Sequence, residues 1–133
     1  EGSSEESVVQ IESFWQALGA NTRRVGAATH DRLLAQSSHL PHLVAAALIQ
    51  ALGPEAESLV GNGFLDTTRI ASGDPGMWRD IFQTNRDELL AAAEKLQAVV
   101  KEWAAALRRS DNDTIQGLLE SAKERRDRLL SDR

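Results

Sequence analysis

The residues of this sequence best suited to chemistry are an arginine and a pair of histidines. Arg69 follows Asp66 by three positions and stands between a glycine-rich stretch, residues 61–63, and a helix start at Asp74. A guanidinium binds a carboxylate through two parallel hydrogen bonds and keeps its charge permanently, so Arg69 is a candidate anchor for a carboxylate ligand. The same spacing is also compatible with an Arg69–Asp66 ion pair that only holds a loop together.

The two histidines, His39 and His42, are three residues apart and share a helix face if the helix is continuous there. Histidine can ligate a metal or act as a general acid or base. A zinc site needs further nitrogen, sulfur or oxygen ligands, and none occurs at a suitable spacing, so we expect no metal site. A histidine on an apolar helix is more often a hydrogen-bonded core residue.

These residues must be positioned by helices, because the composition favours an all-α fold. Of the 133 residues 41% are hydrophobic but only 5% aromatic, and Ala and Leu, both good helix formers, dominate. Tyrosine is absent and long β-branched runs are scarce, which argues against a sheet. The length suits one domain, so we expect residues 1–133 to form a single helical domain.

Apolar residues at helical spacing predict the elements in the first half of the chain. We expect a first helix over residues 5–18 that stops at Gly19, and a linker over residues 20–28. Thr29 is the expected N-cap of an apolar helix that reaches residue 52, is buried on most sides, and is kinked near Pro41.

Capping signals predict the elements of the second half. A short helix over residues 55–60 precedes Gly61-Asn62-Gly63, which we interpret as a flexible turn. Asp74-Pro75 predicts the start of a helix that carries Trp78. Asn85 and Glu88 form a capping box for a long helix over residues 86–109, and Asp113 with Gln116 repeats the signal for a helix over residues 114–130.

Charge and composition exclude several classes of function. The net charge of −5 argues against general binding to the phosphates of a nucleic acid, and the one basic cluster, residues 123–128, is interleaved with acids as on a solvated helix face. The chain has no cysteine, so disulfides and thiolate chemistry are excluded. No apolar run is long enough for a transmembrane helix and the acidic start is unlike a signal peptide, so we expect a cytoplasmic protein without membrane contact.

Two stretches together resemble a known family. Ser38-His39-Leu40-Pro41-His42, with His30-Asp31 before it, and the run from Gly61 through Asp66-Thr67-Thr68-Arg69 to Trp78 resemble the C-terminal domain of prephenate/arogenate (cyclohexadienyl) dehydrogenases. The resemblance covers roughly residues 8–110. It implies an NAD(P)-dependent oxidative decarboxylation in tyrosine biosynthesis.

The resemblance also assigns roles to individual residues. It implies that Arg69 binds the carboxylate of prephenate or arogenate, that His42 and Trp78 border the substrate pocket, and that His39 either contacts substrate or holds the kinked backbone. Trp15 and Trp103 have no such support, and we expect them in the core. The catalytic histidine of the family belongs to its nucleotide-binding half, so we expect no catalytic residue in this chain.

That nucleotide-binding half has no counterpart in the sequence. No Gly-x-Gly-x-x-Gly occurs, and Gly61-Asn62-Gly63 follows no predicted strand. We therefore expect NAD or NADP to bind the complete enzyme but not this chain, which would be inactive alone. Apolar helix surface that one chain cannot cover predicts a homodimer through the helices at residues 30–52 and 86–109. The alternative is a stand-alone helical module for dimerisation or carboxylate binding, without catalysis.

Overall fold

The computed structural model describes residues 2–131, and within that range the chain is helical and contains no strand. The chain divides into two compact units, residues 1–31 and 32–133. The all-α fold class is therefore confirmed. A single domain over residues 1–133 stays a prediction.

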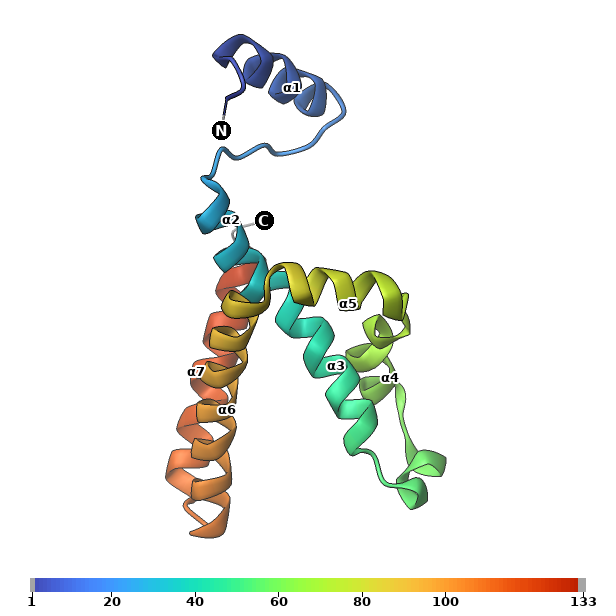
Figure 1. Cartoon of the computed structure of the whole chain (residues 1–133). Coiled ribbons are helices and arrows are strands. Elements are labelled where there is room, and N and C mark those ends of the chain that lie inside the picture. The colour runs from blue at the N-terminus through green and yellow to red at the C-terminus, as the bar shows by residue number, and fades with distance from the viewer. Residues whose placement is uncertain (1, 132–133) are drawn as a thin grey trace. The chain divides into compact units, whose positions relative to one another are not determined.

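An extended segment joins α1 to α2, and the later helices follow one another with short connections (Figure 1). Seven of the described elements are α-helices, two are 3-10 helices and one is a π-helix. In chain order they are α1 (Glu5–Ala17), α2 (Ala27–Leu34), the π-helix η1 (Ala35–His39), α3 (Leu40–Ala51), the 3-10 helix η2 (Pro54–Leu59), α4 (Asn62–Thr68), the 3-10 helix η3 (Arg69–Ser72), α5 (Pro75–Thr84), α6 (Arg86–Arg108) and α7 (Asn112–Ser131).

Helix α1 of the first unit has well-defined ends. Ser4 is its N-cap, and the Ser4 hydroxyl accepts a hydrogen bond from the backbone N–H of Ser7. Gly19 adopts a φ of 83°, a left-handed conformation that glycine tolerates, and ends the helix as expected from the sequence. Trp15 is 50% exposed, so the expectation that it lies in the core is wrong for this chain.

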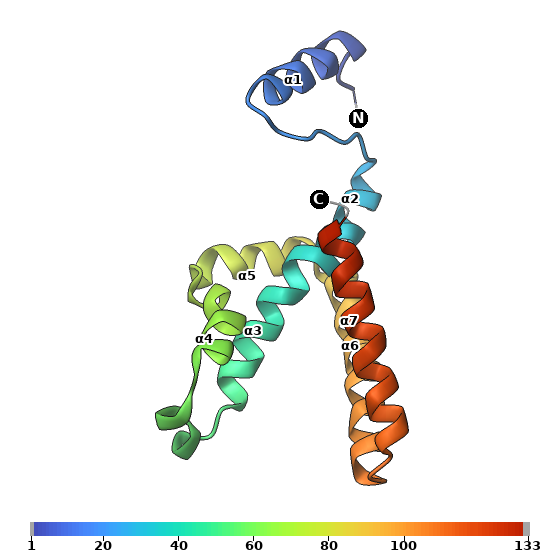
Figure 2. The same ribbon diagram turned by 180° about the vertical axis from the view of Figure 1, so that it is seen from behind.

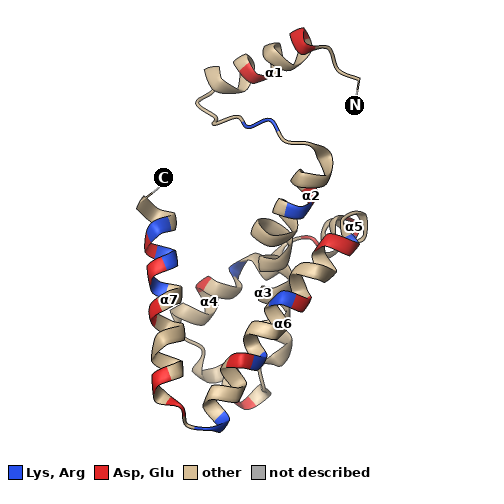
Figure 3. Ribbon diagram, turned by 90° about the vertical axis from the view of Figure 1, so that its left-hand side faces the viewer, with Lys and Arg blue, Asp and Glu red and all other residues tan. Residues whose placement is uncertain are grey.

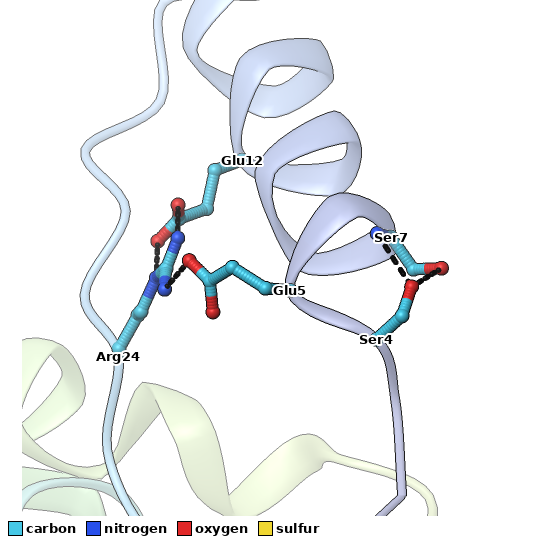
Figure 4. A network of polar contacts seen from close by, with 5 residues as sticks. All are labelled: Ser4, Glu5, Ser7, Glu12 and Arg24. Carbon is cyan, nitrogen blue, oxygen red and sulfur yellow. Dashed lines mark hydrogen bonds and ion pairs between the residues drawn. The ribbon is translucent and has the colours of Figure 1, made fainter.

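Arg24 ties the extended segment after α1 back to the helix. Its guanidinium donates two hydrogen bonds to the Glu12 carboxylate, at 2.7 and 2.6 Å, and one to Glu5 at 2.6 Å (Figure 4). The hydrogen bond from Arg24 lowers the pKa of the Glu12 carboxyl, and the same contacts raise the pKa of Arg24. All three side chains remain accessible to solvent.

A π-helical segment lies where the sequence predicted a kink, near Pro41. The backbone N–H of Leu40 donates to the carbonyl of Ala35, five residues earlier, which widens the helix for one turn just before Pro41. The helix starts earlier than expected: α2 begins at Ala27, so Thr29 lies inside the helix and is not its N-cap. The π-helix ends at His39.

The second unit consists of two groups of helices. Helices α6 and α7 form an antiparallel hairpin and lie side by side in both views (Figures 1 and 2). Helix α3 packs against α4 and η3 in the other group, and α5 connects this group to the start of α6. The π-helix η1 contacts both α3 and α6, so the widened turn lies where the two groups meet.

Two local structures differ from those expected. Gly61-Asn62-Gly63 is no flexible turn: Gly61 is the N-cap of α4, and neither glycine has a positive φ. Helix α7 begins two residues before Thr114, because Asp111 accepts the hydrogen bond from the backbone N–H of Thr114 in place of the expected cap at Asp113. The predicted start of α5 is confirmed, since Asp74 accepts a 2.7 Å hydrogen bond from the Met77 N–H.

The buried core of the chain is small and consists mainly of alanine. Its buried apolar residues are Ala35, Ala45, Leu89, Ala92 and Ala106. Contrary to expectation, α3 is not buried on most sides within this chain: Ala45 is buried, but Leu48 and Ile49 are exposed. The acidic and basic residues near the end of α7 alternate on a solvated helix, as expected (Figure 3).

Candidate functional site

A pocket of about 400 Å³ lies among α3, η3 and α5 in the second unit. This volume falls in the range typical of small-molecule sites. The wall is mostly apolar, with a few polar side chains. The lining residues are His42, Ala46, Ile70, Ala71, Gly73, Pro75, Trp78, Arg79, Phe82 and Gln83.

Two residues named from the sequence, His42 and Trp78, meet in this pocket. Their ring centroids are 3.4 Å apart and their planes are inclined by 23°, so the imidazole stacks on the indole. Phe82, one turn further along α5, extends the aromatic wall with its centroid 5.7 Å from that of Trp78. The helix start at Asp74-Pro75 thus places the Trp78 ring against the first turn of α3.

The environment of His42 disfavours its charged form. Burial lowers the pKa of His42 from the usual 6.5, and the nearby imidazole of His39 acts in the same direction, whereas a hydrogen bond to the backbone of Ile70 opposes them. At neutral pH the ring is therefore an uncharged hydrogen-bonding group within an apolar wall.

His39 lies behind the pocket wall and does not line the pocket. It is only 9% exposed, and its Nδ1 lies 3.2 Å from Nδ2 of Asn85. Its ring meets that of Trp78 edge to face, with centroids 6.4 Å apart. Of the two roles considered for His39, support of the backbone and of the pocket wall therefore fits its position better than direct ligand contact.

Gly73 leaves room for the Trp78 indole. A Cβ atom at this position would lie 2.5 Å from Nε1 and 2.8 Å from Cδ1 of Trp78, closer than packed atoms approach. The φ of Gly73 is −64°, which any residue can adopt, so the requirement for glycine is steric. The contact explains why a glycine directly precedes the Asp74 cap.

Arg69 is exposed at the junction of α4 and η3 and does not itself line the pocket. The next two residues, Ile70 and Ala71, do line it, so the arginine lies beside the pocket wall. Among residues 2–131 no ion pair joins Arg69 to Asp66, so the expected alternative of an ion-paired loop is not observed.

Sequence reasoning missed two polar residues of the pocket, Arg79 and Gln83. They are four residues apart on α5 and line the same cavity as Trp78. The Arg79 guanidinium pairs with the neighbouring Asp80 at 2.8 Å, and both side chains are largely exposed. Helical spacing could have identified both residues, because residues 75, 78, 79, 82 and 83 fall on one side of a helix that begins at Asp74-Pro75.

Neither a metal cluster nor a membrane-spanning helix occurs in the described part of the chain. No three His, Asp or Glu side chains there gather closely enough to hold a metal ion. Over the same residues, no helix has both the length and the apolar character needed to cross a membrane.

A family model described as "Prephenate dehydrogenase, dimerization domain" matches residues 26–121 of the chain, which include the entire pocket. The chain belongs to the prephenate dehydrogenase family. The resemblance seen in the histidine and arginine stretches is therefore confirmed.

Curated relatives of this prephenate dehydrogenase domain are longer proteins. A cyclohexadienyl dehydrogenase of Zymomonas mobilis is 32% identical over an alignment 126 residues long, which covers 90% of this chain and 42% of the relative. A prephenate dehydrogenase of Bacillus subtilis is 29% identical over an alignment 130 residues long, which covers 93% of this chain and 35% of the relative. The chain thus spans less than half the length of either relative.

Solved structures of the family share the fold. The arogenate dehydrogenase of Synechocystis superposes with a TM-score of 0.82 at 26% identity, covering 94% of this chain and 48% of that structure. The prephenate dehydrogenase of A. aeolicus, in complex with hydroxyphenyl propionate and NAD+, gives a TM-score of 0.77 at 30% identity and covers 94% and 46%.

Proposed function

We propose that this chain is the C-terminal helical domain of an NAD(P)-dependent dehydrogenase that acts on prephenate or arogenate. The observation that carries the proposal is the pocket of His42 and Trp78 within the residues that match the dimerization domain of the family. In the complete enzyme the domain would supply one wall of the substrate site and the dimer interface.

The chemistry of the pocket suits a cyclohexadienyl carboxylate. An apolar and aromatic wall favours the ring, while His42 and Gln83 offer uncharged hydrogen-bonding groups for a hydroxyl. A substrate carboxylate needs a cation, and Arg69, beside the wall, is the residue that we propose to bind it. Arg79 lines the cavity itself, but its charge is already offset by Asp80.

The nicotinamide nucleotide requires a binding site of its own. Such a site uses a strand, a glycine-rich turn and a helix N-terminus, and residues 2–131 contain no strand. We therefore propose that another part of the complete enzyme binds NAD or NADP and supplies its catalytic residues. The proposed reaction oxidises the substrate ring and releases carbon dioxide as the ring becomes aromatic.

We also propose that two copies of this chain associate through the domain. Within one chain, Leu48 and Ile49 of α3 and Val99 and Val100 of α6 are exposed, which leaves apolar surface on both helices that the sequence assigned to an interface. Sedimentation equilibrium at micromolar concentration should give about twice the mass of 14.5 kDa. A stable monomer would contradict this part of the proposal.

An activity assay tests the proposed function directly. The full-length protein is mixed with prephenate or arogenate and with NAD or NADP, and reduction of the nucleotide is followed by absorbance. We expect activity with at least one of the four combinations, and no activity from residues 1–133 alone. Absence of activity in all four, from a folded protein that binds nucleotide, would contradict the proposal.

A further inference from the structure

The side chain of Asn85 does not have the role that its position in the sequence predicts. Asn85 lies between α5 and α6, and its backbone serves both helices: its N–H donates to Ile81, and its carbonyl accepts from Leu89 at 3.0 Å. The side chain, however, makes no capping hydrogen bond at the start of α6. Asparagine at an N-cap usually uses its side-chain oxygen for that bond, so this side chain serves another purpose.

A partner of that side chain is His39, 46 residues earlier in the chain. Nδ2 of Asn85 lies 3.2 Å from Nδ1 of His39, and both residues are 9% exposed. The amide NH2 group can only donate, so Nδ1 of His39 must accept and the ring proton must be on Nε2. The contact therefore fixes the tautomer of a neutral ring as well as its orientation.

Contacts continue from His39 to the pocket wall. The His39 ring meets Trp78 edge to face, and Trp78 in turn stacks with His42. His39 ends the π-helical segment, a kind of turn that is rare and frequently lies at functional sites.

We propose that Asn85 is a positioning residue for the pocket. Asn85 fixes the His39 ring in its Nε2-protonated form, and the His39 ring in turn positions the Trp78 ring on which His42 stacks. The residue does not line the pocket and acts on it through His39. The inference rests on the proposed function for the identity of the ligand, but the geometry that it describes can be tested without any ligand.

The test uses the 133-residue chain labelled with 15N in its histidines. Long-range 1H–15N spectra at neutral pH report which ring nitrogen of His39 carries the proton. We expect the Nε2-protonated form for His39 in the unmodified chain. Protonation on Nδ1 would overturn the proposal, and this measurement requires no variant that could fail to fold.

Two variants and a control test the role of the amide. Asn85→Asp replaces the donor by a carboxylate, which should draw the His39 proton to Nδ1 and shift the Trp78 indole signal. Asn85→Ala should give a mixture of tautomers and a similar shift. Asp111→Ala, which removes a true helix cap at the start of α7, should leave both signals unchanged. Unaltered His39 and Trp78 signals in both Asn85 variants would overturn the proposal and leave the proposed dehydrogenase function untouched.

Discussion

The imidazole of His42 lies flat against the indole of Trp78, with ring centroids 3.4 Å apart. The two residues come from different helices, α3 and α5, so the stack is a direct side-chain contact between those helices at the pocket. Anything that displaces the Trp78 ring should therefore change both the stability of the second unit and the shape of the pocket wall.

Substitution of Gly73 tests this packing. In Gly73→Ala the new methyl group would lie 2.5 Å from Nε1 of Trp78, so the ring must shift. We expect overpacking of this kind to lower the free energy of unfolding by about 1–3 kcal/mol, measured by chemical denaturation. The matched control is Gly63→Ala, a helical position with open space around it, where we expect a gain of about 0.5–1 kcal/mol. Equal effects of the two changes would show that the Trp78 ring is not held as described.

The stability of the domain should depend on pH through His42. Burial lowers the pKa of this residue below 6.5 in the folded chain, so the unfolded chain binds the proton more readily. Stability should be complete above about pH 6.5 and should fall as the pH decreases toward the lower folded pKa. Thermal melting over this range measures the effect.

Two variants separate His42 from other titrating groups. His42→Gln keeps a hydrogen-bonding side chain but removes the proton site, and it should flatten the loss of stability below about pH 6.5. His30→Gln, a change at an exposed histidine outside the pocket, should retain the loss. Identical pH profiles for His42→Gln and the unmodified chain would contradict this assignment.

Arg69 should act on substrate affinity in the full-length enzyme and not on folding. Arg69→Ala loses the charge and the paired donors, and we expect its KM for substrate to rise by a factor that corresponds to about 2–4 kcal/mol. Arg69→Lys keeps the charge and should be affected less. Because the described residues show no ion pair between Asp66 and Arg69, the melting temperature should hardly change. A large loss of stability, matched by Asp66→Ala, would support the ion-paired loop instead.

Arg24 should hold the extended segment of the first unit to α1. Arg24→Ala removes the hydrogen bonds to Glu5 and Glu12, so amide hydrogen exchange in residues 20–26 should become faster. Arg23→Ala alters the adjacent arginine and serves as the control. Equal protection of residues 20–26 in the two variants would show that the ion pairs do not restrain the segment.

Local signals in the sequence were sufficient for most of the fold. Asp74-Pro75 marks the start of α5, and apolar residues repeated at helical spacing mark α6. These signals can be read from the sequence because capping and helix propensity depend on residues only a few positions apart. Likewise, Gly19 ends α1 where expected. The glycines at positions 61 and 63 led to the wrong prediction of a flexible turn. Both adopt ordinary helical or extended backbone conformations, and α4 forms despite their turn propensity.

The candidate site was predictable only in part. His42 and Trp78 were named from their resemblance to family residues, but that their rings stack depends on the packing of α3 against α5. The spacing of Asn85 and Glu88 predicted that the Asn85 side chain caps a helix. That side chain contacts His39 instead, a residue 46 positions away that no local pattern could identify. Helical spacing places Arg79 on the same side of α5 as Trp78, but that this side lines a pocket depends on tertiary packing.

The central claim, that the His42–Trp78 pocket forms a wall of the substrate site, is tested most directly by steady-state kinetics of the full-length enzyme carrying His42→Ala. We expect KM for prephenate or arogenate to rise by roughly tenfold, as for loss of one hydrogen-bonding contact to the ligand, while KM for the nucleotide stays unchanged. An unchanged substrate KM in the folded variant, or equal effects on substrate and nucleotide, would contradict the claim.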